Sequence, residues 1–203
     1  MRPLTTTRLL TLAIFLTAFG CSAESSDQDR GAVVAGAAAP DIVLRGIDGR
    51  ATSLSRLRGH IVVLAFNGVE CPISKLLADR IRDIAAEYAD RGVLFFGVNS
   101  NVTDGVEDLR DFARLHRIAF PMVKDEGAEI ADALGAERTT DVFVFDAEGR
   151  QRFHGPVDDQ YTLVDGRAMG GKSPSPDRDW LRETLDAVLA GRPVPAERVE
   201  APG

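Results

Sequence analysis

The sequence predicts an α/β fold in which a mixed central sheet carries helices on both faces and a short hairpin precedes the sheet. Short apolar runs typical of buried strands alternate with amphipathic stretches of helical period between residues 40 and 191. The last two predicted strands are separated by a four-residue turn, which adds an antiparallel pair to parallel strands. Of the 203 residues, 44% are hydrophobic and 27% charged, which are proportions typical of globular proteins.

The first part of this domain contains a hairpin and two buried strands. Asp48-Gly49 is a turn signal between short strands at 42–44 and 51–53. The runs HIVVLAF at 60–66 and VLFFGV at 93–98 are continuously apolar, which is typical of parallel strands covered on both faces.

The clearest helix is predicted over residues 72–91. Pro72 stands where the first helical residue belongs, and Gly92 stands where a helix stops. Its apolar residues fall on one stripe, so we expect them to face the core. They are Ile73, Leu76, Leu77, Ile81, Ile84, Ala85 and Tyr88.

The second part of the domain continues the alternation. It contains predicted helices at 104–116, 127–135 and 176–190, and predicted strands at 120–123, 142–145 and 151–154. The expected inward anchors of the first and last of these helices are Leu109, Phe112, Ala113, Leu115, Trp180, Leu181, Leu185, Val188 and Leu189. Residues 155–175 read as a long loop, either a solvated excursion or a lid or partner surface.

The two ends of the chain look different from the domain. Residues 1–20 have a positive start and an apolar stretch, which indicates a signal peptide. The sequence before Cys21 resembles a bacterial lipobox, so we expect lipidation of Cys21; ordinary secretion with cleavage near Ala23 is the alternative. Residues 21–39 are then a flexible tether, and the proline-containing stretch 192–203 is an extended tail.

Charge and residue counts exclude several classes of function. The formal net charge of −7 argues against a nucleic-acid partner, which selects for a basic patch. Two cysteines cannot form a disulfide framework or a cysteine-rich zinc site. His60, His116 and His154 lack metal-ligand spacing, so we expect no metal and no cofactor. We expect His154 to be a strand residue with a half-exposed ring.

Chemistry is predicted at Cys71. The strand at 60–66 runs directly into residues 67–71, and Cys71 lies at the start of the clearest helix. The helix dipole and the unpaired N–H groups there favour a thiolate and lower the pKa of Cys71. A carboxylate at Glu70 opposes this effect, whereas the ammonium of Lys75 supports it. The alternative is an inert, buried cysteine.

Several segments together resemble a redoxin domain of the thioredoxin-like superfamily, which includes the alkyl hydroperoxide reductase and thiol-specific antioxidant group. These segments are residues 39–44, Asp48-Gly49, 53–55, 57–59 and the strand that follows. Residues 71–75, 97–101 and 158–161 resemble exported bacterial members. The resemblance covers roughly residues 38–192 and implies a thioredoxin-like fold.

The sequence departs from the family in three places. Ser74 stands where dithiol oxidoreductases have the second cysteine. A dithiol catalytic cycle, in which a second cysteine of the same chain resolves the mixed disulfide, is therefore excluded. Gly68 stands where peroxiredoxins carry the Thr or Ser that orients peroxide. Thr140-Asp141 replaces the usual Thr-cis-Pro; we expect a trans bond there, and a carboxylate that raises the pKa of Cys71.

The resemblance implies a membrane-tethered, extracytoplasmic, thiol-based oxidoreductase that uses Cys71 alone. Its partner would be a peroxide or an external thiol or disulfide protein, with the membrane bound through the lipid alone. We expect the site to be shaped by Gly68, Glu70, Pro72, Ser74, Lys75, Thr140 and Asp141, and a partner loop to include Asp158, Asp159, Gln160 and Tyr161. The alternative is a non-catalytic module that binds a partner protein.

Overall fold

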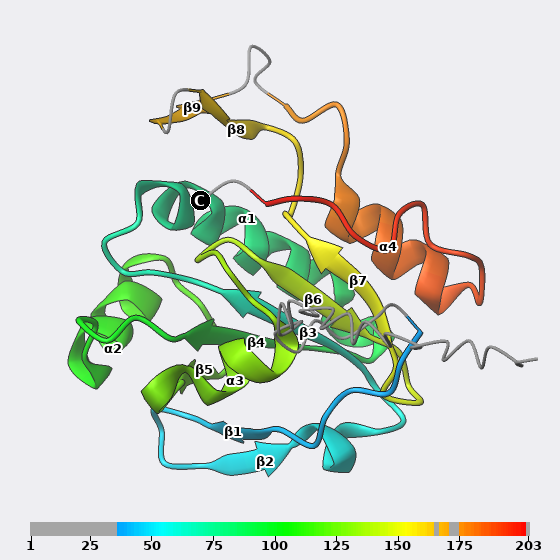
Figure 1. Cartoon of the computed structure of the whole chain (residues 1–203), viewed down its shortest axis with the longest axis horizontal. Helices are drawn as coiled ribbons and strands as arrows, with labels where there is room; N and C mark the ends of the chain where they lie inside the picture. The colour runs from blue at the N-terminus through cyan, green and yellow to red at the C-terminus, as the bar shows by residue number, and fades with distance from the viewer. Residues whose placement is uncertain (1–35, 165–166, 171–174, 202–203) are drawn as a thin grey trace, which may run out of the picture.

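A five-stranded mixed sheet with the order β5-β4-β3-β6-β7 forms the centre of the computed structural model (Figure 1). The structure describes residues 36–164, 167–170 and 175–201. The predicted signal peptide, the predicted lipidation site Cys21 and most of the predicted tether lie outside these residues.

The strands of this sheet follow the predicted order with small shifts at their ends. They are β3 (Ile61–Phe66), β4 (Val93–Asn99), β5 (Met122–Lys124), β6 (Val142–Phe145) and β7 (Gln151–Gly155). β3, β4 and β5 pair in parallel, whereas β6 pairs antiparallel with β3 and with β7. The predicted mixed sheet is therefore confirmed.

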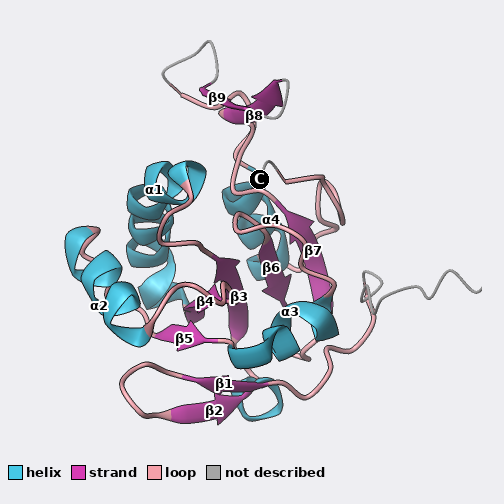
Figure 2. Ribbon diagram, turned by 60° about the vertical axis from the view of Figure 1, so that its left-hand side comes forward, coloured by secondary structure: helices cyan, strands magenta, loops and turns pink. Residues whose placement is uncertain are grey.

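Helices cover both faces of the sheet, as predicted (Figure 2). The helices α1 (Pro72–Tyr88) and α4 (Trp180–Leu189) pack on one face, in a core that includes Val63, Phe153 and Leu185. The helix α3 (Glu129–Leu134) packs on the opposite face with the hairpin of β1 (Val43–Arg45) and β2 (Ala51–Ser53). The helix α2 (Val106–Leu115) lies beside β5.

The ends of the helices follow local chemistry. Pro72 is the first residue of α1, and Gly92 follows the 3-10 turn Ala89–Arg91 with a φ of 77°, a conformation that favours glycine. The helix α4 begins later than predicted because the Asp179 carboxylate accepts the Arg182 N–H at 3.1 Å and caps it there.

Two residues assigned to inward-facing stripes are exposed. Leu76 on α1 is 55% exposed and Leu115, the last residue of α2, is 75% exposed. Leu76 lies at the edge of the α1 stripe, and α2 ends at Leu115 without a neighbouring element to cover it. These two predictions of burial are wrong.

The stretch 155–175 is not the structureless loop that the sequence suggested. It contains a second antiparallel hairpin, formed by β8 (Tyr161–Val164) and β9 (Arg167–Gly170), which projects from the domain above α1 (Figure 1). The turn at Asp165-Gly166 lies outside the described residues.

Segments from both ends of the chain lie along β7. The N–H of Gly36 donates to the Gln151 carbonyl at 2.7 Å, so the last residues of the predicted tether are bound to the sheet. In the predicted tail, the N–H of Val199 donates to the His154 carbonyl at 2.9 Å. A Cβ on Gly155 would lie 2.8 Å from the Val199 carbonyl oxygen, so glycine permits this close approach.

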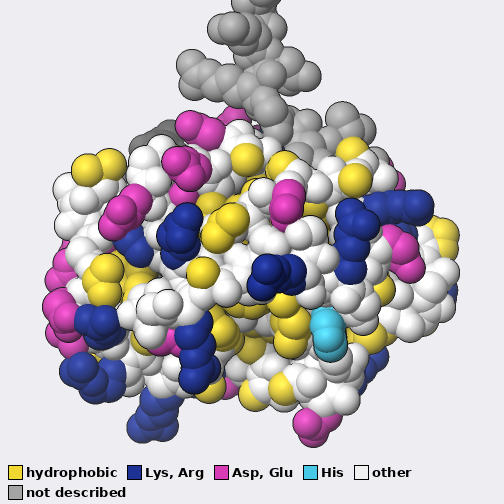
Figure 3. Space-filling view, turned by 90° about the horizontal axis from the view of Figure 1, so that it is seen from below, with side chains coloured by type: hydrophobic (Ala, Val, Ile, Leu, Met, Phe, Trp, Pro, Cys, Tyr) yellow, Lys and Arg dark blue, Asp and Glu magenta, His cyan; other side chains and the backbone are white. Residues whose placement is uncertain are grey.

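The surface around the β1–β2 hairpin carries charges of both signs. Figure 3 views the molecule from the side on which this hairpin lies, and basic and acidic side chains are interspersed there between small apolar areas. No helix within the described ranges is both long and apolar enough to cross a bilayer.

Replacing Leu185 by Ala should lower the free energy of unfolding by about 2–5 kcal/mol, because its side chain is fully buried between α4 and the sheet. The matched control is Leu76→Ala, which should change it by less than about 0.5 kcal/mol because Leu76 is exposed. Denaturant unfolding monitored by Trp180 fluorescence measures both, and equal losses in the two variants would contradict this assignment of the core.

Candidate active site

Cys71 lies between the carboxyl end of β3 and the first turn of α1, as predicted. Its backbone is extended (φ −70°, ψ 119°), and it occupies the N-cap position before Pro72. The Cys71 N–H donates to the Gly68 carbonyl at 3.2 Å, and its own carbonyl accepts the first helical hydrogen bond from Lys75 at 3.1 Å. The thiol is half-buried, so it remains within reach of a reactant.

The surroundings of Cys71 lower the pKa of its thiol. Burial is the largest effect and raises the pKa, because it disfavours the charged thiolate. Hydrogen bonds from the Thr139 side chain, from the backbone and hydroxyl of Ser74 and from the backbone of Ile73 together outweigh burial. The net effect stabilises the thiolate, which is the nucleophilic form.

The two charged neighbours of Cys71 pair with each other. The Lys75 ammonium lies 3.2 Å from the Glu70 carboxylate, and the two side chains are 44% and 85% exposed. Opposite charges paired at an exposed site largely cancel at a third group and are screened by salt. Neither residue is among the five largest effects on the pKa of Cys71.

Ser74, which stands in place of a second cysteine, joins two segments of the site. Its buried hydroxyl accepts the Gly68 N–H at 3.1 Å and donates to the Thr139 carbonyl at 2.8 Å. Gly68 precedes Cys71 and Thr139 precedes β6, so one hydroxyl fixes both sides of the thiol. Cys71 is the one cysteine among the described residues.

Gly68 is closely surrounded. A Cβ at this position would lie 2.7 Å from Asn101 Nδ2, 3.1 Å from Thr139 Cγ2 and 3.2 Å from Cys71 Cβ. A side chain of the kind that peroxiredoxins have here would displace the end of Asn101 and press on Thr139, whose side chain occupies the adjoining space.

A buried polar network beneath the loop was not predicted. The Asp104 carboxylate accepts the Val69 N–H at 2.9 Å, Asn99 Nδ2 at 2.8 Å and Asn101 Nδ2 at 3.1 Å. Asn99 Nδ2 also donates to the Asn67 carbonyl at 3.0 Å. The network thus fixes the backbone that leads to Cys71.

The strand order of a parallel sheet could have predicted this network. β3 and β4 are parallel neighbours, so Asn67 and Asn99, which lie at their carboxyl ends, must meet at one edge of the sheet. Lys124, at the end of the next parallel strand, joins them by donating to Asn99 Oδ1 at 2.9 Å and to the Asn101 carbonyl.

Thr140 and Asp141 lie at the start of β6, opposite Cys71 in the site. No cis peptide bond occurs among the described residues, so the predicted trans bond before Asp141 is confirmed. The Asp141 carboxylate accepts the N–H groups of Glu137 and Arg138 and lies 3.4 Å from His154 Nε2. The carboxylate is thus engaged by the turn and by His154, whereas the pKa of Cys71 is set chiefly by burial and by the contacts of Thr139, Ser74 and Ile73.

The expectation of a half-exposed His154 is wrong. The residue is 5% exposed, because its ring stacks on Phe143 at 4.1 Å and the segment around Val199 covers it. Burial raises the pKa of Asp141, but hydrogen bonds from His154 and from the turn outweigh it and leave the pKa below its ordinary value.

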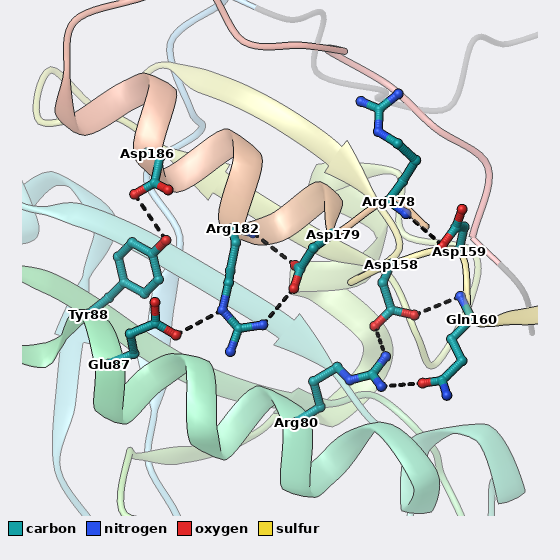
Figure 4. A network of polar contacts seen from close by, with 10 residues as sticks. All are labelled: Arg80, Glu87, Tyr88, Asp158, Asp159, Gln160, Arg178, Asp179, Arg182 and Asp186. Atoms are coloured by element: carbon teal, nitrogen blue, oxygen red, sulfur yellow. Dashed lines mark hydrogen bonds and ion pairs between the residues drawn. The ribbon is translucent and has the colours of Figure 1, made fainter. Parts of the chain in front are cut away.

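The residues predicted as a partner loop anchor the base of the β8–β9 hairpin (Figure 4). Arg80 of α1 donates to the buried Asp158 carboxylate and to the Gln160 side chain. Asp159 accepts the Arg178 N–H at 2.9 Å, and Tyr161 packs against the core. The hairpin is therefore tied to α1 at its base.

Polar side chains also connect α1 with α4. Arg182 donates to Glu87 at 2.8 Å and to Asp179 at 2.5 Å, and the Tyr88 hydroxyl donates to Asp186 at 3.1 Å (Figure 4). Burial, together with the Asp186 carboxylate, raises the pKa of Tyr88 to about 12, so the hydroxyl remains a donor.

The site offers little room for a bound group. Within the described ranges, no group of three or more His, Cys, Asp or Glu side chains has a geometry that could hold a metal ion. The cavity behind Ser74 and Thr139 measures about 20 Å³, which is close to the space of one water molecule. Cys71 does not line this cavity, and its half-buried thiol is partly exposed at the surface.

The strand order and the thiol at the start of α1 define a thioredoxin-like domain. The chain belongs to the AhpC/TSA family, whose model matches residues 35–154. It is similar to the thiol-disulfide oxidoreductase ResA of Halalkalibacterium halodurans, with 31% identity over 129 residues that cover 63% of this chain and 72% of the relative. Chloroplastic peroxiredoxin Q of Oryza sativa subsp. japonica is 30% identical over 127 residues, 59% of this chain and 57% of that protein.

Solved structures support the same fold. A hypothetical protein from Sinorhizobium meliloti superposes with a TM-score of 0.72 at 28% identity, over 84% of this chain and 92% of that one. A thioredoxin-family thiol:disulfide interchange protein from Chlorobium tepidum superposes with a TM-score of 0.56 at 19% identity, over 78% of this chain and 99% of that one, and bears on the fold alone.

Replacing Gly68 by Thr, the residue type found in peroxiredoxins, should lower the free energy of unfolding by about 1–3 kcal/mol, because the new atoms overlap Asn101 and Thr139. The control is Glu70→Thr, which introduces the same residue type at an exposed neighbouring position and should change stability by less than about 0.5 kcal/mol. Denaturant unfolding compares the two, and a fully stable Gly68→Thr variant would refute the packing argument.

Proposed function

We propose that this protein is a thiol oxidoreductase that uses Cys71 as its single nucleophile and depends on an external thiol. The observation that carries the proposal is the placement of Cys71 at the start of α1, where Thr139 and Ser74 lower the pKa of its thiol. A half-buried thiolate at such a position is a nucleophile held open to a reactant.

The first proposed substrate is a disulfide of a partner protein. The Cys71 thiolate attacks one sulfur, a mixed disulfide forms, and the second partner sulfur leaves as a thiolate. Because Ser74 provides no second thiol, an external thiolate attacks the partner's sulfur in the mixed disulfide and releases the Cys71 thiolate. The name of the ResA relative, a thiol-disulfide oxidoreductase, supports this class of reaction.

A peroxide is the second proposed substrate, and one observation favours it. The Thr139 side chain fills the space beside Gly68 and lowers the pKa of Cys71, so a hydroxyl is available near the sulfur. The thiolate attacks one peroxide oxygen, the O–O bond breaks, and the leaving oxygen takes a proton to form an alcohol or water. The resulting sulfenic acid condenses with an external thiol and loses water, and a second thiol then restores Cys71.

The test is the rate of Cys71 alkylation against pH, followed by product trapping. On a chain that begins after Cys21, we expect an inflection below about 8.5, the value for an ordinary cysteine. A disulfide-containing peptide should give a mixed disulfide detectable by mass spectrometry, and a peroxide should give an adduct with a sulfenic-acid reagent. Cys71→Ser should abolish both products.

An inflection at or above about 8.5 with no product from either substrate would refute the enzyme proposal. The remaining reading would then be a thioredoxin-like module that binds a partner without chemistry. Partner binding that is unchanged in Cys71→Ser would support that reading.

We also propose that the protein is exported and anchored to the membrane through a lipid on Cys21. The support is the sequence of residues 1–21, which combines a signal-peptide pattern with a lipobox-like end. Mass spectrometry of the full chain expressed in a bacterium should find a lipidated N-terminal Cys21, and Cys21→Ala should release the protein from membranes. An unmodified N-terminus near Ala23 would overturn the anchor and leave simple secretion.

A further inference from the structure

We propose that Asp141 and His154 are positioning residues for Cys71, because they hold the turn at 137–141 so that Thr139 stays against the thiol. This inference rests on the proposed function and names the residues that keep its nucleophile poised. It concerns side chains that do not touch a reactant.

The turn is built on the Asp141 carboxylate. One carboxylate oxygen, Oδ2, accepts the Glu137 N–H at 2.8 Å and the Arg138 N–H at 3.0 Å. The Asp141 backbone closes the turn, since its N–H donates to the Arg138 carbonyl at 3.2 Å and its carbonyl accepts the Phe66 N–H at 2.8 Å. Phe66 ends β3, so the turn is attached to the strand that leads into Cys71.

His154 fixes the other carboxylate oxygen. His154 Nε2 lies 3.4 Å from Asp141 Oδ1, and the two side chains are 6% and 4% exposed. The ring is stacked on Phe143, and its backbone is bonded on the outer side to Glu197 and Val199. The pair is thus enclosed by β6, β7 and the segment near the end of the described chain.

Four further charged groups line the shallow cleft over this pair. They are Glu137, Arg138, Arg198 and Glu200. Two carry each sign, and Arg138 Nη2 lies 3.2 Å from the Glu200 carboxylate. The formal charges of these four groups cancel, and the contacts made by the Asp141 carboxylate come from the turn and from His154.

Thr139 connects the turn to the surroundings of the thiol. It lies two residues before Asp141, inside the turn, and its carbonyl accepts the Ser74 hydroxyl at 2.8 Å. Its side chain lies beside the loop of Cys71, since a Cβ on Gly68 would be 3.1 Å from Thr139 Cγ2 and 3.2 Å from Cys71 Cβ, and it has the largest of the effects that lower the pKa of Cys71. A turn that loosens would withdraw both contacts, whereas Cys71 would keep its place at the start of α1.

The experiment measures the pH inflection of Cys71 alkylation in the folded chain that begins after Cys21. Thr139→Val removes the hydroxyl and keeps the shape of the side chain. The inflection should move to higher pH, so that at a fixed pH below it the fraction of Cys71 present as thiolate falls about tenfold. Asp141→Asn should shift the inflection in the same direction by a smaller factor, about threefold. The double variant should match Thr139→Val alone, since Asp141 is proposed to act on the thiol only through Thr139.

The matched control is Asp146→Asn. Asp146 is buried at the other end of β6, where its carboxylate accepts the Arg150 N–H at 2.8 Å and contacts Arg152 at 3.3 Å. It should lose stability as Asp141→Asn does and keep the wild-type inflection. If Asp141→Asn does not fold, His154→Gln removes the imidazole and keeps the carboxylate, and it should shift the inflection upward as well.

A wild-type inflection in Asp141→Asn or, should that variant not fold, in His154→Gln would overturn the inference, as would an equal shift in Asp146→Asn. These outcomes leave the proposed function intact when the wild-type inflection is low and products form. An ordinary inflection and no products in the wild type would instead defeat the proposed function.

Discussion

The Ser74 hydroxyl is the contact on which the site depends. It accepts the Gly68 N–H and donates to the Thr139 carbonyl, so it joins the loop before α1 to the turn before β6. Both segments lie at the end of the sheet where β3 and β4 finish, and neither has a regular element of its own. A buried hydroxyl with both partners satisfied holds them together at little cost in desolvation. The half-buried Cys71 sits between them.

The rest of the domain supplies the rigidity that this contact needs. The Asn99–Asp104 network fixes the loop from below, and the Asp141–His154 pair fixes the turn from the other side. The helix that carries Cys71 is bound to α4 and to the base of the β8–β9 hairpin by arginine contacts. A thiolate whose donors come from two segments requires that neither segment moves, and these contacts limit that movement.

Much of the fold follows from the sequence alone. The continuous apolar runs of β3 and β4 and the Pro72–Gly92 limits of the first helix are local signals, and the structure bears them out. The β8–β9 hairpin was missed because its residues carry no strong alternation of apolar and polar types. The depth of His154 was missed because its ring stacks on Phe143 and its strand pairs with the segment at Val199, forty-five residues later, and no local pattern reports such contacts.

The residues of the candidate site also fall into those that local sequence predicts and those that it does not. Cys71 was predicted because a cysteine before Pro72 is a local signal with a chemical meaning. The position of Thr139 against the thiol was not predicted, because it depends on how the turn before β6 is folded. The pairing of Glu70 with Lys75 was not predicted, because it is a matter of side-chain geometry that the spacing of the two residues leaves open.

The pairing along both borders of the central sheet has a consequence for how the protein meets other chains. β7 is bordered by Ala37 at one end and by Glu197 to Val199 at the other, and β5 is bordered by Gly46 and Ile47. Unpaired border strands invite strand addition and aggregation, and here irregular segments occupy those positions. The five-stranded sheet is therefore shielded along parts of both borders from growing by another strand.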